Sequence, residues 1–168
     1  MSLNLNMAKS KDKTNVMRVL DQKKVPYVPH TYPHEEGVAV DGVTAAAKMG
    51  KDPAVVFKTL VTRGASGQYH VFVIPVCREL DLKAAARACG EKSVTMIPVS
   101  DLLPLTGYIR GGCSPIGMKK PFDTTLDRSA EDLDTVTVSA GRIGWQVELT
   151  PADLASLTRA RFAPVTTE

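Results

Sequence analysis

The chain has 168 residues, of which 43% are hydrophobic and 23% are charged. This length and composition are typical of one globular domain with a sizeable core, and we expect that domain to span residues 9–168, after an N-terminal extension at residues 1–8. The 21 basic and 18 acidic residues give a net charge of +3, which is weaker than in a dedicated duplex-binding domain. That charge is compatible with a polyanionic substrate held briefly, and equally with no role in nucleic-acid binding.

The cysteines and the apolar segments exclude further classes of protein. Cys77, Cys89 and Cys113 are odd in number and show no CxxC spacing, which argues against a disulfide framework and a zinc ribbon. Such cysteine usage favours a reducing compartment, so we expect a cytoplasmic protein. No apolar segment approaches the length that crosses a membrane, and we expect no membrane partner.

The first predicted elements are short and bounded by prolines and glycines. A helix capped by Asp12 or Thr14 is expected to end before Pro26. Residues 27–32 (YVPHTY) predict an edge strand, because proline cannot donate to a sheet ladder. Residues 41–50 predict a short helix with a glycine just past its end.

A predicted hairpin contains a lysine among apolar neighbours. Its strands are residues 54–62 (AVVFKTLVT) and 68–76 (QYHVFVIPV). Period-two alternation places Lys58 on the same face as Val56 and Leu60. The lysine either lies over these neighbours with its ammonium in water, blocks aggregation at a sheet edge, or lines a pocket that needs a positive charge. Alternation alone favours the first two interpretations, because lysine is rarely buried.

The rest of the chain continues the mixture of strands and helices. Ser100 is expected to cap a helical turn and Thr150 to cap the last helix. Hairpins interspersed with helices predict an α+β (mixed α/β) fold: one domain with a curved, mixed and mostly antiparallel sheet flanked by helices. The predicted helices cover residues 81–90, 100–105, 129–133 and 150–160, and the predicted strands cover residues 92–98, 135–139, 145–149 and 161–167.

A glycine-rich loop at residues 107–117 (GYIRGGCSPIG) is followed directly by Lys119 and Lys120. Glycine is favoured where the backbone needs positive φ or where a ligand approaches closely. The loop offers backbone N–H groups and the Ser114 hydroxyl beside two cations, which suits a phosphate, a ribose hydroxyl or a carbonyl oxygen. A purely structural tight turn is the alternative. The loop lacks the GxGxxG and Walker patterns of nucleotide-binding proteins.

A second predicted hairpin, residues 135–149, places Ser139 and Gln146 where they could flank a shared surface. Without further information, an ordinary amphipathic hairpin with its polar side in solvent is the preferred interpretation.

Histidine and cysteine give no strong catalytic pattern. His30 and His34 are separated by a proline and have no nearby cysteine, so we expect no metal site. His70 lies in an apolar strand and is expected to be packed or hydrogen-bonded. Cys113 could be nucleophilic only with a nearby base, which the sequence does not supply, so a structural cysteine is favoured.

Four segments together resemble a known family. HTYPHEEG, VFKTLV, GYIRGGCSPIGMKKPF and SAGRIGWQVEL occur in the order and at the spacing found in the YbaK/EbsC family of aminoacyl-tRNA deacylases. These proteins are free-standing relatives of the editing domain inserted in bacterial prolyl-tRNA synthetase. The resemblance runs from about Thr14 to Phe162, nearly the whole chain.

The resemblance implies removal of cysteine from mischarged Cys-tRNA(Pro), or from Cys-tRNA(Cys), without a cofactor. In the cysteine-directed members the substrate thiol attacks its own ester carbonyl. Lys58 is then the critical catalytic residue. The resemblance implies that Tyr32, Thr59, Gly111 and Ser139 line the substrate pocket. We also expect substrate contacts from Asp41, Gly112, Ser114 and Gln146.

The resemblance also implies two macromolecular partners. The first is the acceptor end of a mischarged tRNA, for which Arg110, Lys119 and Lys120 are candidate phosphate contacts. The second is prolyl-tRNA synthetase, in a transient complex.

Two positions depart from the family and affect substrate choice. Asp41 stands where some members carry a phenylalanine, and Gln146 stands where some carry an aspartate. The loop sequence GGCSPIG resembles the cysteine-directed branch. The alternatives are a deacylase for another small aminoacyl-tRNA such as Ala-tRNA(Pro), and a non-catalytic module that binds tRNA 3′ ends or nucleotides.

Overall fold

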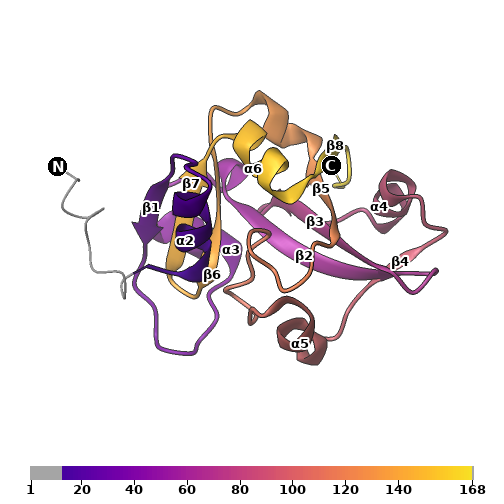
Figure 1. Cartoon of the computed structure of the whole chain (residues 1–168), viewed down its shortest axis with the longest axis horizontal. Helices are drawn as coiled ribbons and strands as arrows, with labels where there is room; N and C mark the ends of the chain where they lie inside the picture. Colours follow the sequence, from indigo (N-terminus) through magenta and orange to yellow (C-terminus); the bar gives the residue numbers. More distant parts are fainter. Residues whose placement is uncertain (1–12, 168) are drawn as a thin grey trace.

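The computed structural model describes residues 13–167, so the predicted extension at residues 1–8 lies outside the described residues. Within these described residues, eight strands form two sheets, with helices packed around them (Figure 1). The strands are β1 (Val28–Thr31), β2 (Phe57–Gly64), β3 (Tyr69–Pro75), β4 (Val94–Met96), β5 (Asp123–Asp127), β6 (Val136–Arg142), β7 (Trp145–Leu149) and β8 (Arg161–Ala163). The α-helices are α2 (Asn15–Gln22), α3 (Gly42–Lys48), α4 (Leu82–Cys89), α5 (Leu102–Thr106) and α6 (Pro151–Thr158).

The two sheets differ in strand direction. The smaller sheet has the order β1-β7-β6 and is antiparallel throughout. The larger sheet has the order β4-β2-β3-β5-β8, with antiparallel pairs around β2 and parallel pairs of β5 with β3 and β8. The predicted α+β class is therefore confirmed, although the strands divide between two sheets where one was expected.

The sheets meet where β2 begins. Val56, the residue before β2, makes an isolated parallel bridge to Thr137 of β6. Both residues are buried. This junction places the start of β2, with Lys58, beside the polar side of the β6–β7 hairpin.

Local signals in the sequence determine most helix ends. The Thr14 hydroxyl accepts a hydrogen bond from Met17 N at the start of α2, and Thr150 caps α6 in the same way. Gly90 ends α4 in the left-handed conformation. The predicted cap at Ser100 is wrong: this residue lies inside a 3₁₀ turn, Val99–Asp101, and so lacks the extended backbone of an N-cap.

The core fills both faces of β3. Val71 and Val73 join the main core cluster, where α2 packs on β6, whereas Phe72 and Ile74 belong to the cluster under α4. This division follows from the alternation of side chains along a strand. Because both faces are covered, the strand is apolar throughout, apart from His70 near its start.

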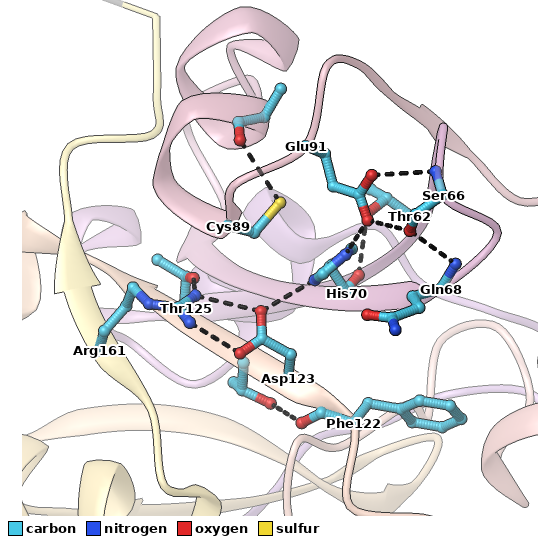
Figure 2. A network of polar contacts seen from close by, with 12 residues as sticks. Thr62, Ser66, Gln68, His70, Cys89, Glu91, Phe122, Asp123, Thr125 and Arg161 are labelled. Carbon is cyan, nitrogen blue, oxygen red and sulfur yellow. Dashed lines mark hydrogen bonds and ion pairs between the residues drawn. The ribbon is translucent and has the colours of Figure 1, made fainter.

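His70 is held between two carboxylates at the edge of this core (Figure 2). Its Nε2 lies 2.7 Å from Glu91 and its Nδ1 lies 2.8 Å from Asp123, which also binds Arg161 of β8. Each ring nitrogen of His70 thus has a carboxylate oxygen within hydrogen-bond distance. The predicted hydrogen-bonded role of His70 is confirmed, and the network ties β3, β5 and β8 to the end of α4.

A second polar cluster surrounds Glu148 of β7. Its carboxylate accepts hydrogen bonds from Thr135, from His30 at 2.8 Å and from Lys51 at 3.0 Å. Lys51 follows α3, so this cluster fastens the α3 segment to the smaller sheet.

The stability of the fold is expected to fall as the pH is lowered from about 4.5 towards 2. Hydrogen bonds from Ser66, with His70 second, lower the pKa of Glu91 from 4.5 to about 2, and a bond from Thr135 does the same for Glu148. A lowered pKa in the folded state stabilises the protein above the unfolded pKa, and this contribution is lost on acidification through the folded pKa. Urea midpoints measured at several pH values test this, and midpoints that do not change below pH 4.5 would contradict it. Glu148→Gln should show a smaller pH dependence.

Candidate active site

A cavity of about 680 Å³ opens where the two sheets, α3 and the glycine-rich loop meet. Its wall is formed by segments that lie far apart in the sequence. Eight of the predicted site residues line it: Tyr32, Asp41, Lys58, Thr59, Arg110, Gly111, Ser139 and Gln146.

Lys58 brings an unpaired positive charge into this cavity. Its side chain is half-buried near the start of β2, and Thr59 beside it also lines the wall. Within residues 13–167, no carboxylate forms an ion pair with the Lys58 ammonium. Of the three interpretations open from the sequence, the geometry supports the pocket-lining one.

The β6–β7 hairpin contributes Ser139 and Gln146, which face each other directly in the strand register. Only 8% of Ser139 and 7% of Gln146 is exposed, so the preferred expectation of a solvent-facing polar side is wrong. The reason is non-local: both side chains line the cavity that α3, the start of β2 and the glycine-rich loop enclose.

Two buried oxygen atoms at the cavity have no hydrogen-bond partner among the described residues. They are Thr59 Oγ1 and Gln146 Oε1. An unsatisfied buried polar atom costs about 1–3 kcal/mol, so such atoms are uncommon outside binding sites. The Gln146 oxygen can only accept and the Thr59 hydroxyl can accept or donate, so a donor group on a ligand would satisfy both.

The glycine-rich loop closes one side of the cavity through its backbone. Gly111 has φ +88°, and a Cβ there would lie 2.9 Å from the Cβ of Ala39 across the cavity wall. Neither Gly112 nor Ser114 lines the cavity. Gly112 instead lets the loop approach Ile143, whose N would lie 3.1 Å from an added Cβ.

Ser114 is fully buried, and its hydroxyl accepts a hydrogen bond from Ile116 N. The predicted substrate contacts of Gly112 and Ser114 are therefore not supported. Local turn formation and loop packing use these residues instead.

The chain matches the family model of the aminoacyl-tRNA editing domain over residues 37–157. It belongs to this family. The chain is 46% identical, over 95% of its length and 97% of the relative's, to EbsC of Enterococcus faecalis, which is provisionally named a Cys-tRNA(Pro)/Cys-tRNA(Cys) deacylase. The motif resemblance is thus confirmed, and with it the assignment as an aminoacyl-tRNA deacylase.

Two solved structures share the fold of this editing domain. One is the hypothetical protein APE2540, with a TM-score of 0.80 and 23% identity over 90% of this chain and 99% of the other. The other is provisionally described as a trans-editing enzyme for prolyl tRNA synthetase, with a TM-score of 0.76 and 24% identity over 91% of this chain and 97% of the other.

The editing domain distributes its candidate tRNA contacts unevenly. Arg110 is exposed and lines the cavity. Lys119 lies outside it, with its ammonium 3.4 Å from the carbonyl of Pro104. Lys120 lines a second cavity.

No lining residue of the editing domain is an activated nucleophile. Cys113 lines the cavity, but burial raises the pKa of its thiol to about 12, so the thiol stays protonated near neutral pH. The Ser139 hydroxyl accepts a hydrogen bond from Gly141 N.

Among the described residues, no group of three or more His, Cys, Asp or Glu side chains could hold a metal ion. No helix among them is long and apolar enough to cross a membrane.

Tyr32 is positioned by backbone and ring contacts. Its N–H donates to Gly144 O, and the ring of His34 lies edge-on to the tyrosine with centroids 6.2 Å apart. The His34 Nδ1 is 3.1 Å from the Tyr32 carbonyl. His30 and His34 therefore serve separate contacts, with Glu148 and Tyr32.

Apart from Asp41, the segment that leads into α3 was not predicted as part of the site. Ala39, Val40 and Gly42 line the cavity beside Asp41. A Cβ at Gly42 would lie 2.3 Å from Val76 Cγ1, so only glycine allows this close approach. In the sequence, a glycine directly after an aspartate that can cap a helix was the signal that could have indicated this segment.

Asp41 has a structural role that a matched pair of substitutions can separate from its charge. Its carboxylate caps α3 by accepting from Thr44 N at 3.1 Å, and the Thr44 hydrogen bonds lower its pKa. Asp41→Ala is expected to lower the free energy of unfolding by about 1 kcal/mol. Asp41→Asn keeps a good cap and should lose little. Urea unfolding of both variants measures this, and equal losses would contradict the capping role.

Proposed function

We propose that this editing domain removes cysteine from mischarged Cys-tRNA(Pro) by attack of the substrate's own thiolate on its ester carbonyl. One observation carries the proposal: the cavity has an unpaired cation and unpartnered acceptors, but its only thiol is held protonated. Such a site binds and polarises an ester without supplying the attacking atom. The substrate named for the 46% identical relative supports cysteine.

The chemistry balances without a protein nucleophile. The cysteinyl thiolate forms a C–S bond to the ester carbonyl carbon, and the C–O bond to the terminal ribose breaks. The ribose oxygen takes a proton and leaves with the tRNA, while the amino acid leaves as a cyclic thioester. The protein folds the side chain back over the ester and stabilises the developing oxyanion, which are the effects that proximity and fixed charge provide.

Each lining group fits one part of an aminoacyl ester. The Lys58 ammonium suits the carbonyl oxygen or the 3′-terminal nucleotide. The acceptors Thr59 Oγ1 and Gln146 Oε1 suit the α-ammonium group, which can satisfy both buried oxygen atoms. Gly111 brings the loop backbone against the substrate without a side chain in the way.

Selectivity follows from the thiol. A pocket separates substrates that differ by one small group by only about 1–3 kcal/mol. Requiring the substrate to supply the thiolate adds a chemical filter that seryl, alanyl and prolyl esters cannot pass, so correctly charged Pro-tRNA(Pro) survives.

The site would act in the cytoplasm beside prolyl-tRNA synthetase. A net charge of +3 supports few phosphate contacts, and each contributes a slope of roughly −0.7 in log K against log salt for single strands. Weak affinity for tRNA favours a transient complex with the synthetase that makes the mischarged product.

Release of labelled amino acid from Cys-tRNA(Pro), Ala-tRNA(Pro) and Ser-tRNA tests the proposal. Rapid loss of cysteine alone is expected, and S-methylation of the cysteinyl group should abolish it. Release of alanine would show that the substrate is a different aminoacyl-tRNA. Release of cysteine that survives S-methylation would show that the mechanism does not use the substrate thiol. If no amino acid is released from any of the three substrates, the protein is a non-catalytic binding module.

A further inference from the structure

A second cavity, of about 350 Å³, lies between the segment after the glycine-rich loop and the C-terminal end of α6. Its walls include Pro115, Gly117, Phe122 and Leu157. The volume is at the lower end of the roughly 300–1,000 Å³ that ligand pockets occupy. The editing chemistry derived above uses none of these residues.

The charge of this second cavity is one-sided. Lys120 and Arg159 line it, and no acidic residue does. Both side chains are exposed, and among residues 13–167 neither forms an ion pair. Two unpaired cations on one concave surface attract an anion, and the apolar walls beside them suit a sugar or a base.

The backbone of Arg159 adds an independent indication. This residue ends α6 with φ 55° and ψ 38°, a left-handed conformation in which glycine is favoured. An arginine at such a position retains strain that a glycine would remove, which indicates a use for its side chain. One use is to complement the negative end of the α6 dipole. The other is to bind a ligand.

One loop connects the two cavities. Cys113 lines the main cavity and Pro115 the second one, and two residues of chain span at most about 7 Å. Wall residues of the two cavities are therefore close neighbours on this loop.

We infer that the second cavity binds a phosphate-ribose unit of the tRNA upstream of its aminoacylated end. Lys120 and Arg159 contact the phosphate, and the walls around Phe122 contact the sugar or base. The second cavity thus binds the tRNA upstream of its 3′ end, whereas the main cavity binds the aminoacyl ester. The inference rests on the proposed function for the identity of the RNA.

Binding of uncharged tRNA(Pro) to the full chain tests this without relying on catalysis. The double variant K120Q/R159G is expected to bind roughly 25-fold more weakly at 0.1 M salt, and to reduce the salt slope by roughly 1.4, which corresponds to two lost single-strand phosphate contacts. The matched control is K23Q/K24G. Lys24 is also left-handed, with φ 57°, and it lines neither cavity.

Each outcome is decisive. Because glycine suits both left-handed positions, neither double variant should unfold below the thermal midpoint of the parent protein. Unchanged tRNA affinity in K120Q/R159G overturns the inference, as does an equal loss in K23Q/K24G. A fall in thermal midpoint with intact affinity assigns Arg159 to the helix dipole instead. Normal tRNA binding with loss of editing only when the synthetase is present would indicate a protein partner.

A kinetic comparison separates this inference from the proposed function. K120Q/R159G should raise KM for Cys-tRNA(Pro), and the increase should be absent with cysteinyl-adenosine, which has no upstream phosphate. If the parent protein releases no cysteine from either substrate, the proposed function fails, while the affinity measurement still decides the inference.

Discussion

Lys58→Ala is expected to lower kcat/KM for release of cysteine from Cys-tRNA(Pro) by roughly 10²–10³-fold, the cost of losing one fixed charge-stabilising donor. The ammonium is the only cationic group on β2 that lines the cavity, and it has no ion-pair partner among the described residues. Its removal should therefore reduce catalysis without reducing stability. Single-turnover release of labelled cysteine measures the effect, and thermal unfolding checks the fold.

Two control variants sharpen this result. Lys58→Arg keeps the charge but replaces a compact ammonium with a planar fork, so partial activity is expected. Lys83→Ala removes an exposed lysine from α4, which lies away from the cavity, and should leave the rate unchanged. If Lys58→Ala releases cysteine at the rate of the parent protein, the assignment of Lys58 as the catalytic residue is wrong.

His70→Ala is expected to lower the free energy of unfolding by about 3 kcal/mol, because it removes two buried hydrogen bonds to carboxylates and leaves their oxygens without this donor. Only 4% of His70 is exposed, and its ring lies within hydrogen-bond distance of both Glu91 and Asp123 (Figure 2). Urea unfolding near neutral pH measures the loss.

The exposed member of the same network provides the control. The Arg161 side chain is 42% exposed, so Arg161→Gln should cost at most about 1 kcal/mol. Equal losses in the two variants would show that burial does not set the strength of this network. A loss of stability below about 1 kcal/mol in His70→Ala would contradict its role as the central residue of this network.

The elements that the sequence predicted well depend on neighbours in the chain. The β2–β3 hairpin, the Thr14 and Thr150 caps and the Gly90 helix end each require only a few adjacent residues. The division into two sheets could not be predicted in this way, because β7 pairs with β1 across more than half the chain.

The site shows the same limit. Lys58 could be placed on a face of its strand by alternation, but that the face borders a cavity depends on α3 and the glycine-rich loop. Ser139 and Gln146 were expected in solvent because nothing near them in sequence shows that α3 and the start of β2 enclose a cavity with them. Ser114 was assigned to the substrate on chemistry alone, whereas the fold uses its hydroxyl within the loop.

The pairing of β1 with β7 has a consequence for synthesis of the protein. His30 and Glu148, which bond across this pair, are 118 residues apart. Strand β1 must therefore wait for β7 to leave the ribosome, and the larger sheet likewise gains its outer strand β8 only from residues 161–163. Contacts of such high sequence separation slow folding. The editing cavity, which needs Tyr32 and Gln146 together, therefore forms only after residue 146 has left the ribosome, and shorter nascent chains lack it.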